Sequence, residues 1–253
     1  MQDAYIVQSV RTPGCKQRRG QFKQTRPEEL VSFILKSAVE KTPGLEPENI
    51  EDVMLGCAFP EAEQGLNIGR VAVKMAGFPD SVSGATINRF CASGLEAIAQ
   101  ASMRVSMGFS DVTIGGGVES MTYVPMGGNM PRPHPEYAAT NPEMYISMGI
   151  TAENVANRYD ISREDQDKFA AASQAKAARA TREGLFTEIV PTPAYKYVLQ
   201  ADGTYKKESF MVEHDDGIRE STPEGLGKLR AVFAAGGSVS AGNSSQSTDG
   251  AAA

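Results

Sequence analysis

Alternating strand and helix patterns restrict the fold of this chain more than any other feature of its sequence. Apolar residues recur at helical spacing between Leu30 and Val39 and again between Ile68 and Met75. Short apolar runs separate these helices, and the connections are long enough for parallel crossovers. The pattern therefore predicts an α/β layered fold, with helices on both sides of a mostly parallel mixed sheet. The predicted strands span residues 4–10, 53–59, 85–88 and 111–114.

Capping signals mark where two of the helices begin. Thr25, followed by Glu28 three residues later, fits a capping box, and Pro43-Gly44 ends that helix. Ser162 with Asp165 fits the same pattern at the start of a long, alanine-rich helix. Gly184 is placed to end it.

A change of composition at Ser120 divides the chain into three predicted segments. We expect residues 1–119 to form one core half, 120–235 an insertion over the sheet ends, and 236–253 a return to the core that stops before its last strand. The start of the insertion is rich in methionine, proline and glycine. Its methionines are equally compatible with an adaptable apolar channel and with irregular gap filling.

Charge and cysteine usage exclude several classes of protein. The net charge is −6, and the longest basic run is Lys16–Arg19, which argues against a dedicated nucleic-acid or membrane-surface binder. Cys15, Cys57 and Cys91 form an odd, widely spaced set that predicts reduced thiols without metal-ligand spacing. We find no signal-peptide pattern and no apolar run of bilayer length, so the expectation is a soluble cytoplasmic protein.

The stretch Asn88–Glu96 holds the strongest candidate for chemistry. Here a short apolar segment leads through a polar turn to Cys91, and a helix rich in small residues follows to about Met107. A helix N-terminus favours negative charge, and the thiolate is the nucleophilic form of cysteine. The competing interpretation is a buried structural cysteine, since free cysteine is among the most buried residue types.

Other candidates are weaker when taken by themselves. Gly115-Gly116-Gly117 lacks the lysine and hydroxyl residue of a phosphate-binding loop and suits a tight passage of the backbone. His134 and His214 lie in polar or proline-rich surroundings and are typical of surface loops. Arg219 is either a phosphate or carboxylate clamp or a solvated side chain, and the serines at 244–245 suggest a polar turn.

Five motifs follow one another along the chain, and they are Asn88–Leu95, Gly115–Met121, Ser147–Asn154, Lys228–Arg230, and Ala241–Ser245 with Asp249–Ala252. Together they resemble the thiolase family, in its N-terminal half with the loop domain that holds coenzyme A. The resemblance implies that Cys91 accepts an acyl group as a thioester. It also implies that Met148 lines the pantetheine and thioester tunnel, that Arg219 lies near the nucleotide of coenzyme A, and that Ser245 meets the pantetheine.

The activity that this resemblance implies is cleavage of a 3-ketoacyl-CoA by free coenzyme A, or the reverse condensation. Coenzyme A would be a substrate, and no cofactor or metal is expected. Ser147 is more similar to the degradative thiolases of fatty-acid β-oxidation than to the short-chain biosynthetic ones. At least a homodimer is implied, with contacts beside the third strand and the Cys91 helix.

The sequence also departs from the family. Thiolases take a histidine base, a second cysteine and an oxyanion-site asparagine from Gly-His-Pro, Cys-x-Gly and Asn-Glu-Ala motifs of a C-terminal half. None of these motifs occurs in residues 1–253. We therefore expect Cys91 to lack its base unless a C-terminal half acts as partner. A non-catalytic module that binds coenzyme A and, less favoured, a ketoacyl-synthase-like condensing enzyme stay open as alternatives.

Overall fold

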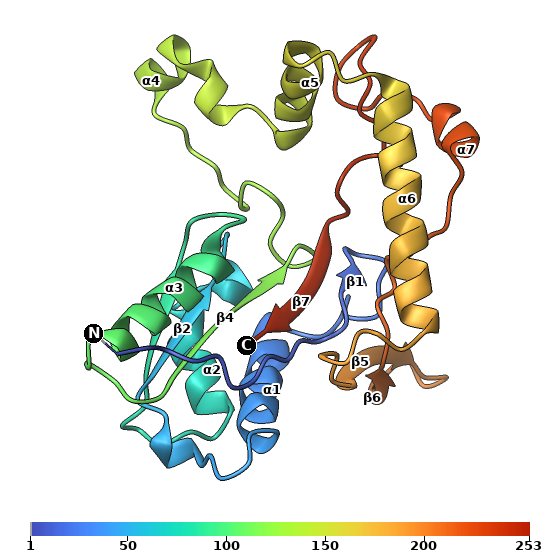
Figure 1. The fold of residues 1–253 in the computed structure, drawn as a ribbon. Helices are drawn as coiled ribbons and strands as arrows, with labels where there is room; N and C mark the ends of the chain where they lie inside the picture. The colour runs from blue at the N-terminus through green and yellow to red at the C-terminus, as the bar shows by residue number, and fades with distance from the viewer. Residues whose placement is uncertain (1) are drawn as a thin grey trace. The chain divides into compact units, whose positions relative to one another are not determined.

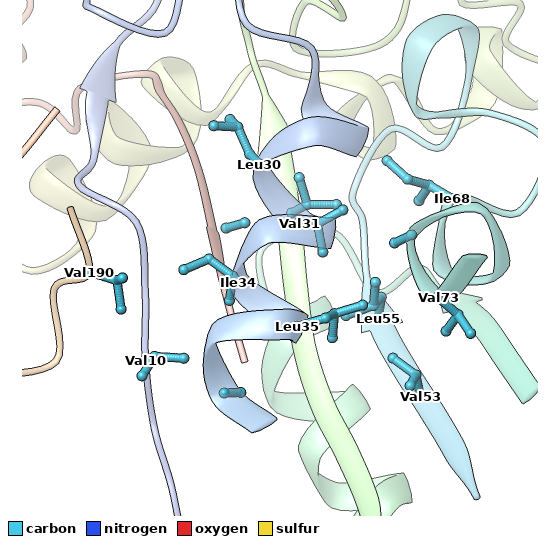
Figure 2. Packing of buried hydrophobic residues seen from close by; sticks show 14 of the residues in the cluster. Val10, Leu30, Val31, Ile34, Leu35, Val53, Leu55, Ile68, Val73 and Val190 are labelled. Carbon is cyan, nitrogen blue, oxygen red and sulfur yellow. The ribbon is translucent and has the colours of Figure 1, made fainter. Parts of the chain in front are cut away.

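The computed structural model describes residues 2–253 and divides them into two compact units. The core unit runs to Asn129 and also contains Glu188–Gly217 and Ser247–Ala253, and the loop unit contains Met130–Thr187 and Ile218–Gln246. These bounds differ from the 120–235 insertion expected from the sequence. The segment 188–217 belongs to the core unit because it buries Val190, Ala194 and Val212 in the core cluster, as Figure 2 shows for Val190 beside Val10.

A five-stranded mixed sheet forms the centre of the core unit (Figure 1). Its order is β1-β7-β4-β2-β3. Strand β2 runs parallel to both of its neighbours, β3 and β4, while β7 is antiparallel to β4 and β1. The predicted α/β class is confirmed. The strands are β1 (Cys15–Lys16), β2 (Asp52–Gly56), β3 (Ser83–Ile87), β4 (Thr113–Ser120) and β7 (Thr248–Ala252).

Side-chain alternation along β2 shows how the helices cover both faces of the sheet. Val53 and Leu55 join the main apolar cluster together with α1 (Pro27–Glu40) and α2 (Ile68–Met75), as Figure 2 shows. Met54 joins the second cluster with Ala97 and Ala101 of α3 (Ser93–Ser106). The Cys91 helix thus packs on the face of the sheet opposite to α1 and α2.

The first predicted strand is absent, and the first helix begins later than predicted. Residues 4–10 are not a strand. Only the end of the run is paired, through Val10 N–H to the Ala253 carbonyl (2.8 Å), and Tyr5, Ile6 and Val7 are exposed. The first helix begins at Pro27 with Arg26 as its N-cap, because the Thr25 hydroxyl is buried and accepts a hydrogen bond from Tyr195 N–H (3.1 Å). Ser162 caps its helix as predicted.

The three glycines of β4 permit close approach of the backbone. A Cβ on Gly115 would lie 2.7 Å from the Ile98 Cα of α3, too close for any side chain. A Cβ on Gly117 would lie 3.0 Å from the Gly56 carbonyl oxygen, which is also a tight contact. The glycines therefore continue the strand beyond the predicted end at residue 114, and their sequence reflects packing rather than phosphate binding.

A groove of about 680 Å³ lies in the core unit beside β4. Residues 2–9 line one side, and Val112–Gly115 together with residues of α3 line the other. β7 pairs with β4 only over Gly117–Ser120, so the groove borders the part of β4 to which β7 does not extend. The strand β7 itself, at 248–252, was not expected from the sequence.

The remaining elements of the two units are one hairpin and a set of helices. The hairpin of β5 (Thr192–Leu199) and β6 (Tyr205–Val212) belongs to the core unit, where the sequence suggested irregular or weakly β structure. None of the helices in residues 2–253 combines the length and the apolar character needed to cross a bilayer. The loop unit holds α4 (Pro135–Thr140), η3 (Pro142–Tyr145), α5 (Met148–Arg158), α6 (Arg163–Arg182) and α7 (Pro223–Gly227), and the core unit also holds η1 (Pro47–Asn49) and η2 (Ala62–Gln64).

Candidate active site

Cys91 is exposed in the turn that joins β3 to α3. The preceding residue, Phe90, has a φ of 47°, a left-handed conformation that is uncommon for a bulky residue. Phe90 N–H donates to the Asn88 side-chain oxygen (2.9 Å), and the Phe90 ring packs against Phe59 at 5.9 Å between ring centres. The turn therefore places Cys91 two residues before Ser93, the first residue of α3, in an exposed position.

The other two cysteines lie in environments that suppress their reactivity. Cys15 and Cys57 are buried, and burial raises the pKa of each thiol to about 12. The Glu119 carboxylate, 3.8 Å from the sulfur of Cys57, adds to the second shift. Because only a thiolate is an effective nucleophile, Cys15 and Cys57 are poor candidates for chemistry, and Cys91 is the exposed thiol.

Close packing fixes α3 against the sheet beside Cys91. A Cβ on Gly56, the last residue of β2, would lie 2.5 Å from Gly94 N and 2.6 Å from the Ser93 carbonyl. Arg89 forms an ion pair with Glu96 (3.0 Å), which joins the turn to the first turn of α3. The absence of a side chain at Gly56 thus permits the close contact between helix and sheet.

The three residues predicted to contact coenzyme A all belong to the loop unit, whereas Cys91 belongs to the core unit. Met148 is the first residue of α5 and is 57% exposed. Arg219 is exposed and is held through its backbone N–H, which donates to Gln174 (2.7 Å). Ser245 is exposed in the segment that follows Asn243. Their predicted roles stay predictions.

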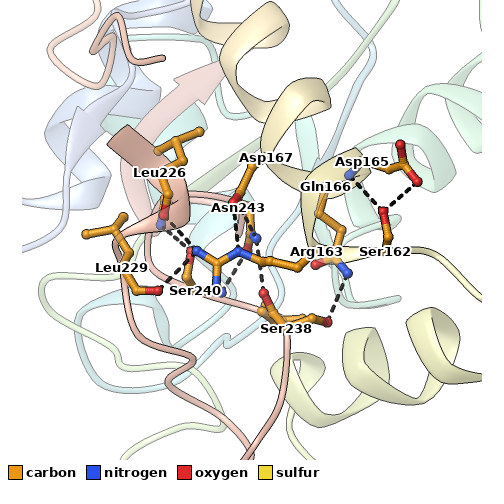
Figure 3. Close-up of polar contacts among 12 residues, drawn as sticks. Ser162, Arg163, Asp165, Gln166, Asp167, Leu226, Leu229, Ser238, Ser240 and Asn243 are labelled. Atoms are coloured by element: carbon orange, nitrogen blue, oxygen red, sulfur yellow. Dashed lines mark hydrogen bonds and ion pairs between the residues drawn. The ribbon is translucent and has the colours of Figure 1, made fainter. Parts of the chain in front are cut away.

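A polar network around the buried Asp167 holds the segment that leads to Ser245 (Figure 3). Asn243 donates to the Asp167 carboxylate (2.9 Å) and accepts from Ser240 N–H (2.7 Å), while Arg163 donates to the same carboxylate (2.8 Å). The Leu226 and Leu229 carbonyls accept two further bonds from Arg163 (2.7 and 3.1 Å). The sequence suggested only a polar turn here, because side chains distant in sequence supply the network.

Glu153 fixes the start of the same segment. Its buried carboxylate accepts N–H bonds from Ser238 (2.9 Å) and Val239 (2.8 Å) and a hydroxyl bond from Ser238 (3.1 Å). The Ser238 backbone bond is the main reason that the pKa of Glu153 lies below its usual value. The sequence placed Glu153 inside the third motif but gave no signal for this partner.

The two histidines lie in exposed positions of the chain. His134 caps α4, where its Nδ1 accepts from Tyr137 N–H (3.3 Å), and His214 is exposed. Both positions agree with the surface-loop interpretation. Across residues 2–253, we find no cluster of three or more His, Cys, Asp or Glu side chains that could hold a metal ion.

Known proteins can be aligned with this chain over nearly its whole length. The chain is 44% identical to a 3-ketoacyl-CoA thiolase of Bacillus subtilis over 255 residues, which is 100% of this chain and 65% of the relative. It is 42% identical to the peroxisomal 3-ketoacyl-CoA thiolase 2 of Arabidopsis thaliana, covering 99% of this chain and 54% of the relative. The chain therefore spans less than two thirds of these relatives.

A solved structure gives the same result at the level of the fold. The crystal structure of the Bacillus anthracis acetyl-CoA acetyltransferase superposes with a TM-score of 0.84 at 33% identity, covering 100% of this chain and 64% of that chain. The family model described as the thiolase N-terminal domain matches residues 4–253. The chain accordingly belongs to the thiolase family and corresponds to its N-terminal domain.

Proposed function

We propose that this chain carries the acyl-accepting cysteine of a thiolase that cleaves 3-ketoacyl-CoA. The observation that supports the proposal best is the exposed Cys91 thiol, held before α3 in a chain of this family whose other two thiols are buried. The named activities of the relatives agree with this chemistry.

The proposed reaction has two steps that share one covalent intermediate. The Cys91 thiolate attacks the 3-keto carbon, the C2–C3 bond breaks, and its electron pair leaves on the enolate of acetyl-CoA, which takes up a proton. The thiol of a second coenzyme A then attacks the acyl thioester and loses its proton. Shortened acyl-CoA leaves, and Cys91 is regenerated. Dividing the difficult cleavage in this way is the advantage of covalent catalysis.

Coenzyme A would bind as a substrate, with Met148, Arg219 and Ser245 contacting it. All three lie in the loop unit and are exposed, which supports this role. We expect Arg219→Ala and Ser245→Ala to weaken coenzyme A binding in calorimetry. Arg158→Ala, another exposed arginine of the same unit, serves as the matched control.

Full turnover is proposed to need groups that these 253 residues do not supply. The base, second cysteine and oxyanion-site asparagine of the family would come from a partner that carries the C-terminal half. A homodimer through the edge strand β3, the exposed Met103 of α3 and the exposed Met107 that follows this helix is also proposed. The degradative direction and a cytoplasmic location complete the proposal, although two plant relatives are peroxisomal by name.

Intact-mass analysis after incubation with acyl-CoA tests the proposal. We expect slow formation of one acyl adduct, located on Cys91, that Cys91→Ser abolishes and that a polypeptide carrying the C-terminal half accelerates. Binding of coenzyme A without any adduct, even after that polypeptide is added, would favour the non-catalytic binding module. Acylation by acyl carrier protein but not by acyl-CoA would favour a ketoacyl synthase.

A further inference from the structure

The turn before Cys91 is held by a serine that follows it. The Ser93 hydroxyl oxygen accepts a hydrogen bond from Arg89 N–H (2.9 Å) and donates one to the Phe90 carbonyl (2.5 Å). These two bonds span Phe90, whose φ of 47° lies in the left-handed region that residues other than glycine rarely adopt. One side chain thus joins the peptide group before Arg89 to the peptide group that links Phe90 to Cys91.

Ser93 is itself fixed by its surroundings. It is only 4% exposed, whereas Phe90 is 63% exposed. Its backbone lies against Gly56 of β2, where no Cβ could be accommodated. The hydroxyl therefore extends from the rigid junction between helix and sheet into a turn that is otherwise open to solvent.

The hydroxyl does not serve as a helix cap. Ala92 is the N-cap of α3 and makes no side-chain capping bond, and both bonds of the Ser93 hydroxyl run backwards to residues 89 and 90. A role confined to helix stability would require bonds to the free N–H groups of the first turn. The geometry instead connects Ser93 to the conformation of the residue that directly precedes Cys91.

We propose that Ser93 is a positioning residue for Cys91. It holds Phe90 in the left-handed conformation, and so fixes the direction in which the Cys91 thiol faces an acyl thioester. This inference rests on the proposed acyl transfer to Cys91. Misplacing a reacting group by about 1 Å can cost on the order of 100-fold in rate, so a turn that relaxes would impair acylation without unfolding the chain.

Two readouts on the same variants test this role. The first is tryptic cleavage of the native chain at the exposed Arg89–Phe90 bond, which reports on the turn whether or not Cys91 is acylated. We expect Ser93→Ala to raise this cleavage at least 10-fold. The second is the rate at which Cys91 takes up the acyl group from acyl-CoA, measured by mass, which we expect Ser93→Ala to lower 10- to 100-fold.

A rescue variant and a matched control separate positioning from general destabilisation. Asparagine tolerates the left-handed region, so Phe90→Asn added to Ser93→Ala should recover most of the acylation rate and slow the cleavage again. Ser32→Ala removes another buried serine hydroxyl of the core unit, bonded to the Glu29 carbonyl (3.2 Å) on α1, and should change neither readout.

The outcomes distinguish this inference from the proposed function. If the wild-type chain is never acylated, even with a C-terminal half present, the proposed function fails. The rate of tryptic cleavage then decides whether Ser93 holds the turn, and cleavage of Ser93→Ala no faster than that of the wild type refutes it. If the wild type is acylated and Ser93→Ala is acylated equally fast, the positioning role is refuted. Equal loss of acylation in Ser32→Ala would also refute it, because the effect would then be general destabilisation.

Discussion

Replacement of Gly56 by alanine tests whether the close contact of α3 with the sheet is as tight as the structure indicates. The new methyl group would lie 2.5 Å from Gly94 N and 2.6 Å from the Ser93 carbonyl, where ordinary contacts begin near 3.4 Å. Both neighbours are backbone atoms, so no side-chain rotation can relieve the overlap. The strand and the helix must separate by about 1 Å, which places the cost near 3 kcal/mol, the upper part of the usual range for overpacking.

Cys15 provides an assay for this change that reports on the core unit alone. Its buried thiol becomes reactive only when that unit opens, so the urea dependence of Cys15 labelling gives the stability of the core unit. A loss of about 3 kcal/mol would lower the urea midpoint by about 1 M. Cys91 acylation should fall as well, because α3 carries the turn that positions the thiol.

Gly94→Ala is the matched control on the neighbouring helix. A Cβ at Gly94 would meet no atom within 4 Å, and alanine is the better helix former. We expect this variant to be unchanged or more stable by up to about 1 kcal/mol. If Gly56→Ala is as stable as Gly94→Ala, the helix–sheet contact described here is wrong.

Three further predictions concern buried groups. At pH 8, a thiol reagent should label only Cys91 in the native chain but all three cysteines in denaturant, because burial raises the pKa of Cys15 and Cys57 to about 12. Since its hydrogen bonds lower the pKa of Glu153, its contribution to stability is present above the ordinary glutamate pKa and is lost as the pH falls through the lowered value. Glu153→Gln should lower stability by about 1–3 kcal/mol at pH 7 and weaken that acid dependence in pH-resolved thermal unfolding. Asp215→Asn removes the ion pair with Arg11 (2.7 Å), so limited proteolysis should cut segment 188–217 faster than in the wild type.

The sequence predicted those parts of the fold that depend on local pattern. The Ile68–Met75 helix has the predicted bounds, and Ser162 caps its helix as expected, because periodicity and capping bonds act over a few residues. The 4–10 run was predicted as a strand on composition alone. A strand also needs a neighbour to pair with, and only Val10 finds one, so the prediction failed for a reason outside the run itself.

The candidate site shows the same division between local and distant information. Cys91 could be identified from its motif, since a cysteine before a helix of small residues is a local signal. Its surroundings could not be predicted, because Gly56 lies 35 positions earlier along the printed sequence. The prediction of Thr25 as a helix cap failed for a similar reason. The Thr25 hydroxyl accepts a hydrogen bond from the backbone N–H of Tyr195, which is distant in sequence.

The two sets of candidate residues should respond independently to mutation, because different bonds hold them. Hydrogen bonds within the core unit fix the Cys91 turn, while Glu153 and Asp167 fix the segment before Ser245 with bonds inside the loop unit. Free-energy effects at sites without shared partners usually add within about 0.5 kcal/mol. Ser93→Ala should therefore leave the Kd for coenzyme A unchanged, and Asp167→Asn should weaken coenzyme A binding without changing the rate at which iodoacetamide alkylates Cys91. A double variant whose effects depart from the sum by more than 1 kcal/mol, measured in a full cycle, would show that the thiol and the coenzyme A residues are coupled and that this separation is wrong.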